Sequence, residues 1–222
     1  KEYRRQRQMC IRDRFNTKAL TEKIKNIAPT AEAKQTLVIL GNMKVDVSSD
    51  SATFTASDLE IEVSTIVKCT SDAPGSFTIP AKKMLEICNA LSTHNEIKLA
   101  VKDSKVDITA GKSKVSLQTL PATDYPIMDR TTENKAAHID VEELQNIINK
   151  TSFAMAYQDA RHFLNGLHIC NDKGKLISVC TDGHRLAKYT STVNIDNDLS
   201  IIIPRKCVIE LNRILGSFTD NK

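Results

Sequence analysis

The sequence predicts an α+β fold in which one unit of helices and antiparallel strands occurs twice. The first observation is a recurring segment, since IPAKKMLE at residues 79–86 returns as IPRKCVIE at residues 203–210, 124 positions later. The second is that each copy alternates between the helical and the extended hydrophobic period. The third is that the same offset, without a gap, aligns further pairs. These pairs are Leu20 with Leu144, Ile24 with Ile148, Leu40 with Leu164, Asp58 with Asp182, and Leu91 with Leu215.

Two helices are predicted in the first copy. The earlier one covers residues 17–27, where Leu20, Ile24 and Ile27 form an apolar stripe at helical spacing. The later one covers residues 81–91 and follows a proline, which suits the start of a helix because its missing N–H has no partner there in any case. Each helix is therefore expected to bury one face against a sheet.

Strands fill the space between and after these helices. Met43, Val45 and Val47 alternate with polar residues, as expected of a strand with one buried face. Two further strands flank a tight turn at residues 57–58. Three more strand-like runs follow the second helix: residues 96–102, 105–110 and 114–120.

The second copy repeats this plan up to its second helix. Its helices are expected at residues 140–150 and 205–215, and its Asp-containing turn at residues 181–183. The counterparts of the last three strands should begin near Asp220. We therefore predict a first domain at residues 15–138 and an incomplete second domain at residues 139–222.

Residues 1–14 carry the whole net charge of the chain. The chain has 31 basic and 27 acidic residues, a net charge of +4, and this segment alone holds six basic and two acidic ones. Such a tail is either an arm that binds nucleic acid or a non-native extension without a role in the fold. We expect the extension, because the first patterned segment begins at Phe15.

Composition excludes several classes of function. No run approaches 18 apolar residues, so a membrane-spanning helix is not expected. Trp is absent and aromatic residues make up 5% of the chain, which disfavours a stacking platform for single-stranded nucleic acid. The six cysteines form no CxxC pair, so neither a metal site nor a cofactor is expected.

The segment TDGHRL at residues 181–186 is the most enzyme-like stretch. A hydrolase using Asp182 and His184 as acid and base is one hypothesis. However, the chain has no recognisable nucleophile motif, and the first copy has Asp58 but no histidine in the equivalent segment SDLEI. The shared aspartate is therefore interpreted as a turn residue. A hypothesis from a different functional class is a non-catalytic repeat module that binds proteins or peptides and has no DNA function.

Seven motifs in order give the chain a resemblance to a known family. They are QTLVILGN, FTASDLEIEV, TIPAKKMLEIC, SLQTLPATDYP, FAMAYQDARHFLNGL, CTDGHRLA and IIIPRKCVIEL, between residues 35 and 211. With these motifs the chain resembles the bacterial DNA polymerase sliding clamp, the beta subunit.

The resemblance implies the DNA-clamp fold, with helices lining a channel and sheets outside. A full chain would have three domains, the third being absent here, and two chains would close head-to-tail into a homodimeric ring. It implies a processivity factor without catalytic activity that encircles duplex DNA in the bacterial cytoplasm, near the nucleoid. Its implied partners are the polymerase catalytic subunit, the clamp loader and other proteins with a clamp-binding motif.

The resemblance also implies three groups of site residues. Contacts to DNA fall on Lys34, Lys82, Gln158, Arg161 and His162. The pocket for client peptides falls on Leu164, Thr181, Gly183, His184, Arg185 and Leu186. The subunit interface falls on Lys83, Ile87, Lys114, Val115, Ser116 and Leu117. The loop with Gln158 and Arg161 has an alternative interpretation, in which Asp159 and Arg161 pair only with each other on an ordinary surface loop.

Overall fold

The computed structural model describes residues 11–31, 37–102, 104–128, 138–194 and 199–219. The chain divides into two compact units, Lys1–Asp129 and Arg130–Lys222. Each unit is built from helices and antiparallel strands, which confirms the predicted α+β class. Among the described residues, no helix combines the length and the apolar character needed to cross a membrane.

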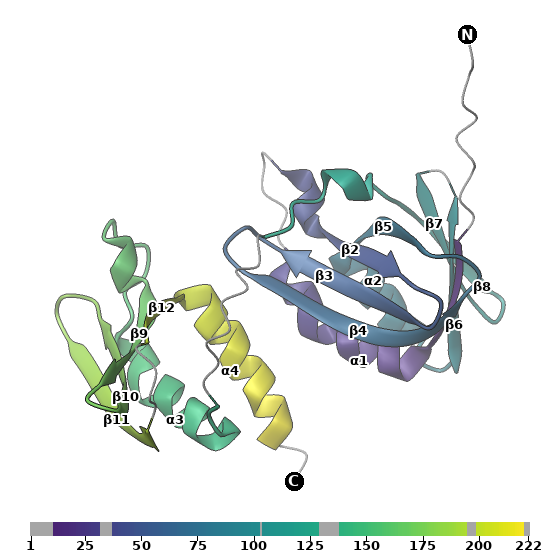
Figure 1. The fold of residues 1–222 in the computed structure, drawn as a ribbon. Helices are drawn as coiled ribbons and strands as arrows, with labels where there is room; N and C mark the ends of the chain where they lie inside the picture. Colours follow the sequence, from purple (N-terminus) through teal and green to yellow (C-terminus); the bar gives the residue numbers. More distant parts are fainter. Residues whose placement is uncertain (1–10, 32–36, 103, 129–137, 195–198, 220–222) are drawn as a thin grey trace. The chain divides into compact units, whose positions relative to one another are not determined.

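The first unit is an eight-stranded antiparallel sheet with two helices on one face (Figure 1). The strands lie in the order β5-β2-β3-β4-β1-β6-β7-β8. Their bounds are β1 Ile11–Asn16, β2 Asn42–Val47, β3 Ser51–Ser57, β4 Glu62–Ser71, β5 Gly75–Pro80, β6 Glu96–Lys102, β7 Lys105–Ala110 and β8 Ser113–Gln118. The helices are α1 Thr17–Ile27 and α2 Ala81–Ala90, with short 3-10 turns at Ala28–Thr30, Val38–Gly41 and Ala122–Asp124.

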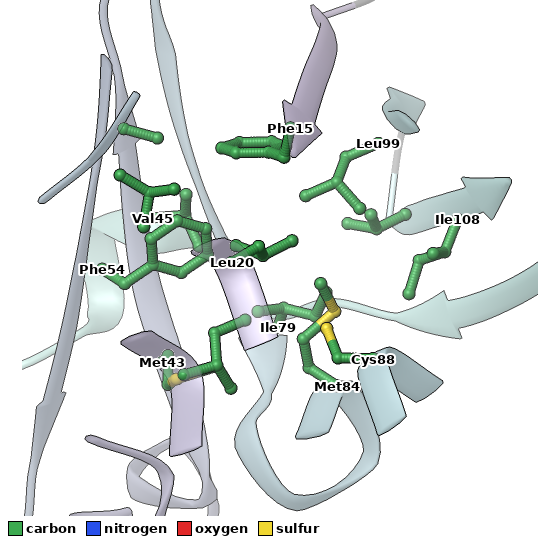
Figure 2. Packing of buried hydrophobic residues seen from close by; sticks show 14 of the residues in the cluster. Phe15, Leu20, Met43, Val45, Phe54, Ile79, Met84, Cys88, Leu99 and Ile108 are labelled. Atoms are coloured by element: carbon green, nitrogen blue, oxygen red, sulfur yellow. The ribbon is translucent and has the colours of Figure 1, made fainter. Parts of the chain in front are cut away.

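The core lies between the helices and the inward face of this sheet (Figure 2). Leu20 from α1 and Met84 from α2 are fully buried against Met43 and the other inward-facing strand residues. The Phe15 and Phe54 rings meet edge-to-face, with centroids 5.9 Å apart, an arrangement that aromatic pairs prefer. Alternating burial along the strands thus sends every second side chain into one core.

Strand β1 corrects the expectation that residues 1–14 take no part in the fold. Ile11–Asn16 pairs with β6 on one side and with β4 on the other, in the middle of the sheet. Asp13 and Phe15 are both buried on the inward face. The expectation is therefore wrong for residues 11–14, because backbone pairing does not need the hydrophobic pattern that the sequence interpretation relied on. Residues 1–10 lie outside the described residues.

A closing segment follows β8 and covers part of the outer sheet face. Leu120 exchanges two hydrogen bonds with the Thr78 hydroxyl, which donates to its carbonyl at 2.8 Å and accepts from its N–H at 2.9 Å. Further along, the Tyr125 hydroxyl accepts from the backbone N–H of Ser57 at 2.9 Å. Burial raises the pKa of Tyr125 to about 12. The two ends of the sheet, β5 and β8, are joined through this segment.

The second unit repeats half of the first. It contains α3 Val141–Thr151, β9 Gly166–Asp172, β10 Lys175–Thr181, β11 Leu186–Asn194, β12 Ser200–Pro204 and α4 Arg205–Thr219, with 3-10 turns at Ser152–Ala154 and His162–Leu164. Its sheet order, β11-β10-β9-β12, matches β4-β3-β2-β5 in the first unit (Figure 1). Even the register is kept, since Met43 pairs with Ile79 as Leu167 pairs with Ile203. The predicted repeat is confirmed.

Candidate functional site

The shared aspartate builds the same turn in both units. In the first unit, Asp58 Oδ1 accepts hydrogen bonds from the N–H groups of Glu60 at 3.0 Å and Ile61 at 2.9 Å. Leu59, which lies between Asp58 and Glu60, has a φ of +73°. A carboxylate that accepts two backbone donors in this way closes a turn, as aspartate commonly does.

In the second unit, Asp182 Oδ1 accepts from the N–H groups of His184 and Arg185, both at 2.9 Å. Gly183 lies at the position of Leu59 and has a φ of +88°, which glycine adopts without strain. These bonds, together with the Arg185 side chain, lower the pKa of Asp182 to about 2. The shared aspartate is thus a turn residue, as expected.

This geometry argues against the hydrolase hypothesis. A general acid–base catalyst works best with a pKa near the operating pH. Asp182 remains ionised far below neutrality and is already occupied by two N–H groups and by Arg185 Nε, which lies 2.9 Å from Oδ2. Its role is to hold the turn.

The turn presents the residues predicted for the peptide pocket. The Thr181 hydroxyl donates to the carbonyl of Arg185 at 2.7 Å and accepts from the N–H of Gly183 at 3.1 Å. His184 and Leu186 are exposed, and Leu186 keeps 65% of its surface accessible. An exposed leucine beside a rigid turn can take part in an apolar contact with a partner.

The loop of residues 156–164 carries the DNA contacts predicted for this unit. Its base is closed by a hydrogen bond from the N–H of Ala156 to the carbonyl of Leu164 at 3.1 Å. The Asn165 side chain brackets Asp159, accepting from its N–H at 3.0 Å and donating to its carbonyl at 2.8 Å. Leu164 is buried beneath the loop.

At the surface of the same loop, Gln158, Arg161 and His162 are exposed. Gln158 adopts a φ of +55°. The loop is therefore a closed structure that points polar side chains outward.

Arg161 and Asp159 form a two-bonded ion pair. Arg161 Nε lies 3.0 Å from Oδ1 and Nη2 lies 2.9 Å from Oδ2, and these bonds lower the pKa of Asp159 to about 2. The alternative interpretation correctly anticipated this pair. The guanidinium also lies against Gly183, where a Cβ atom would come within 3.2 Å of Nη2. The structure thus brings together one residue from the predicted DNA group and one from the predicted peptide group.

Phe153 and Tyr157 are exposed aromatic residues beside these groups, and neither belongs to the three groups of predicted site residues. Phe153 keeps 59% of its surface accessible and Tyr157 keeps 74%. The Arg185 guanidinium carbon lies 5.8 Å from the Phe153 ring centroid. The repeat could have pointed to them, because the first copy has Pro29 and Ala33 at these positions. An exposed aromatic residue in one copy, where the other copy has proline or alanine, indicates a surface that only the second unit has.

Exposed lysines lie on the helices of the first unit. Lys18, Lys23 and Lys25 project from α1, opposite its buried stripe. Lys82 is exposed on α2, and its neighbour Lys83 pairs with Glu86 at 3.0 Å. Lys34 lies outside the described residues. Both helices thus expose cations on the side that does not contact the sheet.

Strand β8 is one of the two edge strands of the first unit's sheet among the described residues. Val115 and Leu117 lie on the inward face, opposite Ile108 and Val106 of β7. Val115 keeps 36% of its surface accessible. The half-buried Ile87 of α2 packs against the same core as Leu117.

Lys114 and Ser116 lie on the other face of β8 and both contact Asp107. The Ser116 hydroxyl donates to its carboxylate, and Lys114 Nζ lies 3.0 Å from Oδ2. These two bonds lower the pKa of Asp107, the serine contributing most. The predicted interface residues thus occupy both faces of one edge strand. No cluster of potential metal ligands occurs in the described part of the chain.

Comparison with known proteins assigns both units. Residues 13–129 match the N-terminal domain of the DNA polymerase III beta subunit, and residues 138–221 match its central domain. The beta sliding clamp of Pseudomonas aeruginosa is 37% identical over 200 residues, which cover 89% of this chain and 54% of that protein. The beta sliding clamp of Escherichia coli is 34% identical over 200 residues, covering 88% and 54%. The chain spans about half the length of the curated relatives it matches.

Solved structures of DNA polymerase III beta subunits have the same fold as this chain. The DNA polymerase III subunit beta from Pseudomonas aeruginosa has a TM-score of 0.86 at 35% identity, covering 92% of this chain and 56% of that one. The pol III beta of Caulobacter crescentus has a TM-score of 0.86 at 31% identity, covering 93% and 57%. A further Pseudomonas aeruginosa clamp, bound to griselimycin, has a TM-score of 0.83 at 34% identity, covering 93% and 57%.

Proposed function

The chain belongs to the DNA polymerase III beta subunit family, and we propose that it forms part of a sliding clamp that encircles duplex DNA and tethers the replicative polymerase. The observation that carries this proposal is the match of two consecutive units to two domains of one family, in order. The repeated strand order and register support it. Because the chain spans about half of its relatives, the ring and its partners belong to the proposal for the longer protein.

Contact with DNA in this proposal is electrostatic and independent of sequence. The lysines of α1 and Lys82 of α2 offer charges to phosphates without reading base edges. In the second unit, Gln158, Arg161 and His162 offer polar contacts from one loop. Weak contacts of this kind suit a duplex that must slide, because the ring itself would provide the retention.

The clamp would do no chemistry of its own. In the proposed pocket, Leu164 forms the floor, Leu186 offers an apolar side, and Gly183 allows the turn and the close approach of the Arg161 guanidinium. The proposed occupants are short peptide segments of the polymerase catalytic subunit, the clamp loader and other clamp-binding proteins. All of these act in the bacterial cytoplasm, where we place the clamp.

The β8 edge is the proposed subunit contact. A sheet edge can extend across an interface through backbone pairing, while Val115 and Leu117 supply apolar contact beside Ile87. Lys83 lies on α2 four residues before Ile87, and Lys114 directly precedes Val115 on β8; both lysines are exposed. This edge would form one half of a head-to-tail interface in the homodimeric ring.

The test uses the longer protein, loaded by its clamp loader onto a nicked circular plasmid. We expect it to stay on the circle through gel filtration at about 200 mM salt and to be lost after linearisation, because a ring slides off a free end. Equal retention on circular and linear DNA would contradict the proposal. The 222-residue chain alone should bind duplex DNA with a Kd of about 10⁻⁴–10⁻⁶ M, weakening steeply with salt.

A further inference from the structure

Arg205, the first residue of α4, is bonded to the loop of residues 156–164 and to its flanks. Its backbone N–H donates to the carbonyl of Asn165 at 2.9 Å. Its Nη1 donates to the carbonyls of Met155 at 3.2 Å and Ala156 at 3.4 Å. Its guanidinium carbon lies 5.6 Å from the centroid of the Tyr157 ring, within the range of a cation–π contact.

These contacts hold both ends of the loop at once. Met155 and Ala156 lead into the loop, and Asn165 leads out of it. The Ala156–Leu164 hydrogen bond closes the base between these ends. Asn165 in turn holds Asp159, the partner of Arg161. A chain of direct contacts therefore runs from the start of α4 to the outward-facing side chains.

The first unit has no arginine at the start of its second helix. The position equivalent to Arg205 is Ala81, a fully buried residue of the core. An alanine cannot donate a hydrogen bond from its side chain, so the arginine is specific to the second unit. The repeat therefore supplies an internal comparison, in which the same helix start carries no side chain able to donate a hydrogen bond.

We propose that Arg205 is a positioning residue, which fixes the loop with Gln158 and Arg161 to the start of α4. The inference rests on the proposed function and adds to it. Loop and helix would then approach duplex DNA as one rigid surface, so that contacts by Gln158 and Arg161 require no further ordering of the loop.

Arginine is suited to this role in a way that lysine is not. Its planar guanidinium can donate to neighbouring carbonyls while its face stacks on an aromatic ring. An ammonium group keeps the charge but loses the fixed geometry. The pair Arg205→Lys and Arg205→Ala therefore separates positioning from simple charge.

The first measurement is amide hydrogen exchange on the 222-residue chain. The reporters are the N–H groups of Ala156, Asp159, Leu164 and Asn165, all of which are hydrogen-bonded in the loop. We expect about ten-fold faster exchange in both Arg205 variants, a factor that corresponds to about 1.4 kcal/mol. Amides of β9 and β10 should keep their protection, which shows that the unit remains folded. Unchanged loop exchange in Arg205→Ala would overturn the proposal.

The matched control is Arg213→Ala. Arg213 lies on the same helix and pairs with Glu210 at 2.9 Å, so its removal deletes the same charge from α4. Arg213 lies eight residues further along α4, about 12 Å from Arg205 at the helical rise of 1.5 Å per residue. We expect loop exchange within about two-fold of the unaltered chain, since the loop's hydrogen bonds stay in place. Faster loop exchange in this control would attribute the effect to charge on α4 and would overturn the assignment to Arg205.

The second measurement is the affinity of the chain for a short duplex, by fluorescence anisotropy across a salt series. Positioning predicts that Arg205→Lys weakens binding nearly as much as Arg205→Ala, although it keeps the charge. Full rescue by lysine would show that charge alone matters. Faster loop exchange with unchanged affinity in both variants would show a merely structural role. If the unaltered chain fails to bind duplex at low salt, the proposed function fails, while the exchange result still judges the anchor.

Discussion

Strand β1 can be removed by truncation, and its loss should destabilise the first unit. The comparison is between a chain lacking residues 1–10, which keeps β1 whole, and a chain lacking residues 1–14, which leaves only Phe15 and Asn16 of the strand. Ile11–Asn16 pairs with β6 at six positions and with β4 at three. The longer deletion removes four of the pairs with β6 and two of those with β4.

The magnitude follows from these pairs. If each pair accounts for roughly one hydrogen bond with a net value of about 0.5–1.5 kcal/mol, the loss is about 3–9 kcal/mol. That is a large part of the roughly 5–15 kcal/mol that stabilises a typical domain. Because β1 lies in the middle of the sheet, its removal also separates β4 from β6. The first unit should therefore unfold far more readily in the longer deletion.

Native-state amide exchange can measure this effect in the whole chain. Amides of β4 and β6 report on the first unit, while those of β9 and β10 in the second unit serve as the internal reference. We expect protection of β4 and β6 to fall by several orders of magnitude in the longer deletion relative to the shorter one, with the reference unchanged. Equal protection in the two truncations would refute the reasoning, because it would mean that β1 pairing adds nothing to stability.

Three further predictions concern single side chains. The Asp13 carboxyl group is fully buried, and this burial raises its pKa although the Ser71 side chain acts in the opposite direction. The folded protein binds this proton more tightly than the unfolded chain, so the free energy of unfolding should fall as pH rises from about 4 through the raised pKa. Asp13→Asn should flatten this part of the pH profile measured by urea unfolding. An identical profile in the variant would contradict the prediction. Tyr125→Phe removes the acceptor for the N–H of Ser57 and should destabilise the first unit by about 1–3 kcal/mol, measured as a lower urea midpoint; no change in the midpoint would mean that water replaces the hydroxyl. The pKa of Asp182 is lowered to about 2, so the hydrogen bonds of its carboxylate to the turn are fully present above pH 4 and are lost as pH falls towards 2. Faster exchange of the His184 amide at low pH should reveal this loss. Asp182→Asn should show the same protection at pH 2 and pH 5 if the carboxylate charge is the cause.

Parts of the fold followed directly from residue patterns. The apolar stripe of α1 predicted its bounds, because a helix that buries one face needs apolar residues at helical spacing. The 124-residue offset predicted that Asp58 and Asp182 would form equivalent turns, and their bonds agree in both copies. A short-range device such as an Asx turn depends on neighbouring residues alone.

The site was predictable only in part. Exposure of Gln158, Arg161 and Leu186 agrees with their expected roles as surface residues. The contact of Arg161 with Gly183 could not be foreseen, because these residues belong to different segments that meet only in the folded unit. Phe153 and Tyr157 were not predicted as site residues for a related reason. An aromatic residue in an apolar segment is expected in a core, and only the folded structure gives its exposure.

By itself, the sequence determined the local elements, the repeat and the resemblance to the clamp family. Spacing along the chain encodes which face of a helix or strand is apolar, and a repeat encodes the same pattern twice. Only the tertiary structure decided that residues 11–14 join the middle of the sheet and that Arg205 holds both ends of a distant loop. The strand pairs through backbone N–H and carbonyl groups, and the Arg205 guanidinium donates to backbone carbonyls, so in both cases the partners are backbone groups that do not depend on residue type. Such groups leave no mark in the sequence, so their partners are known only once the chain is folded.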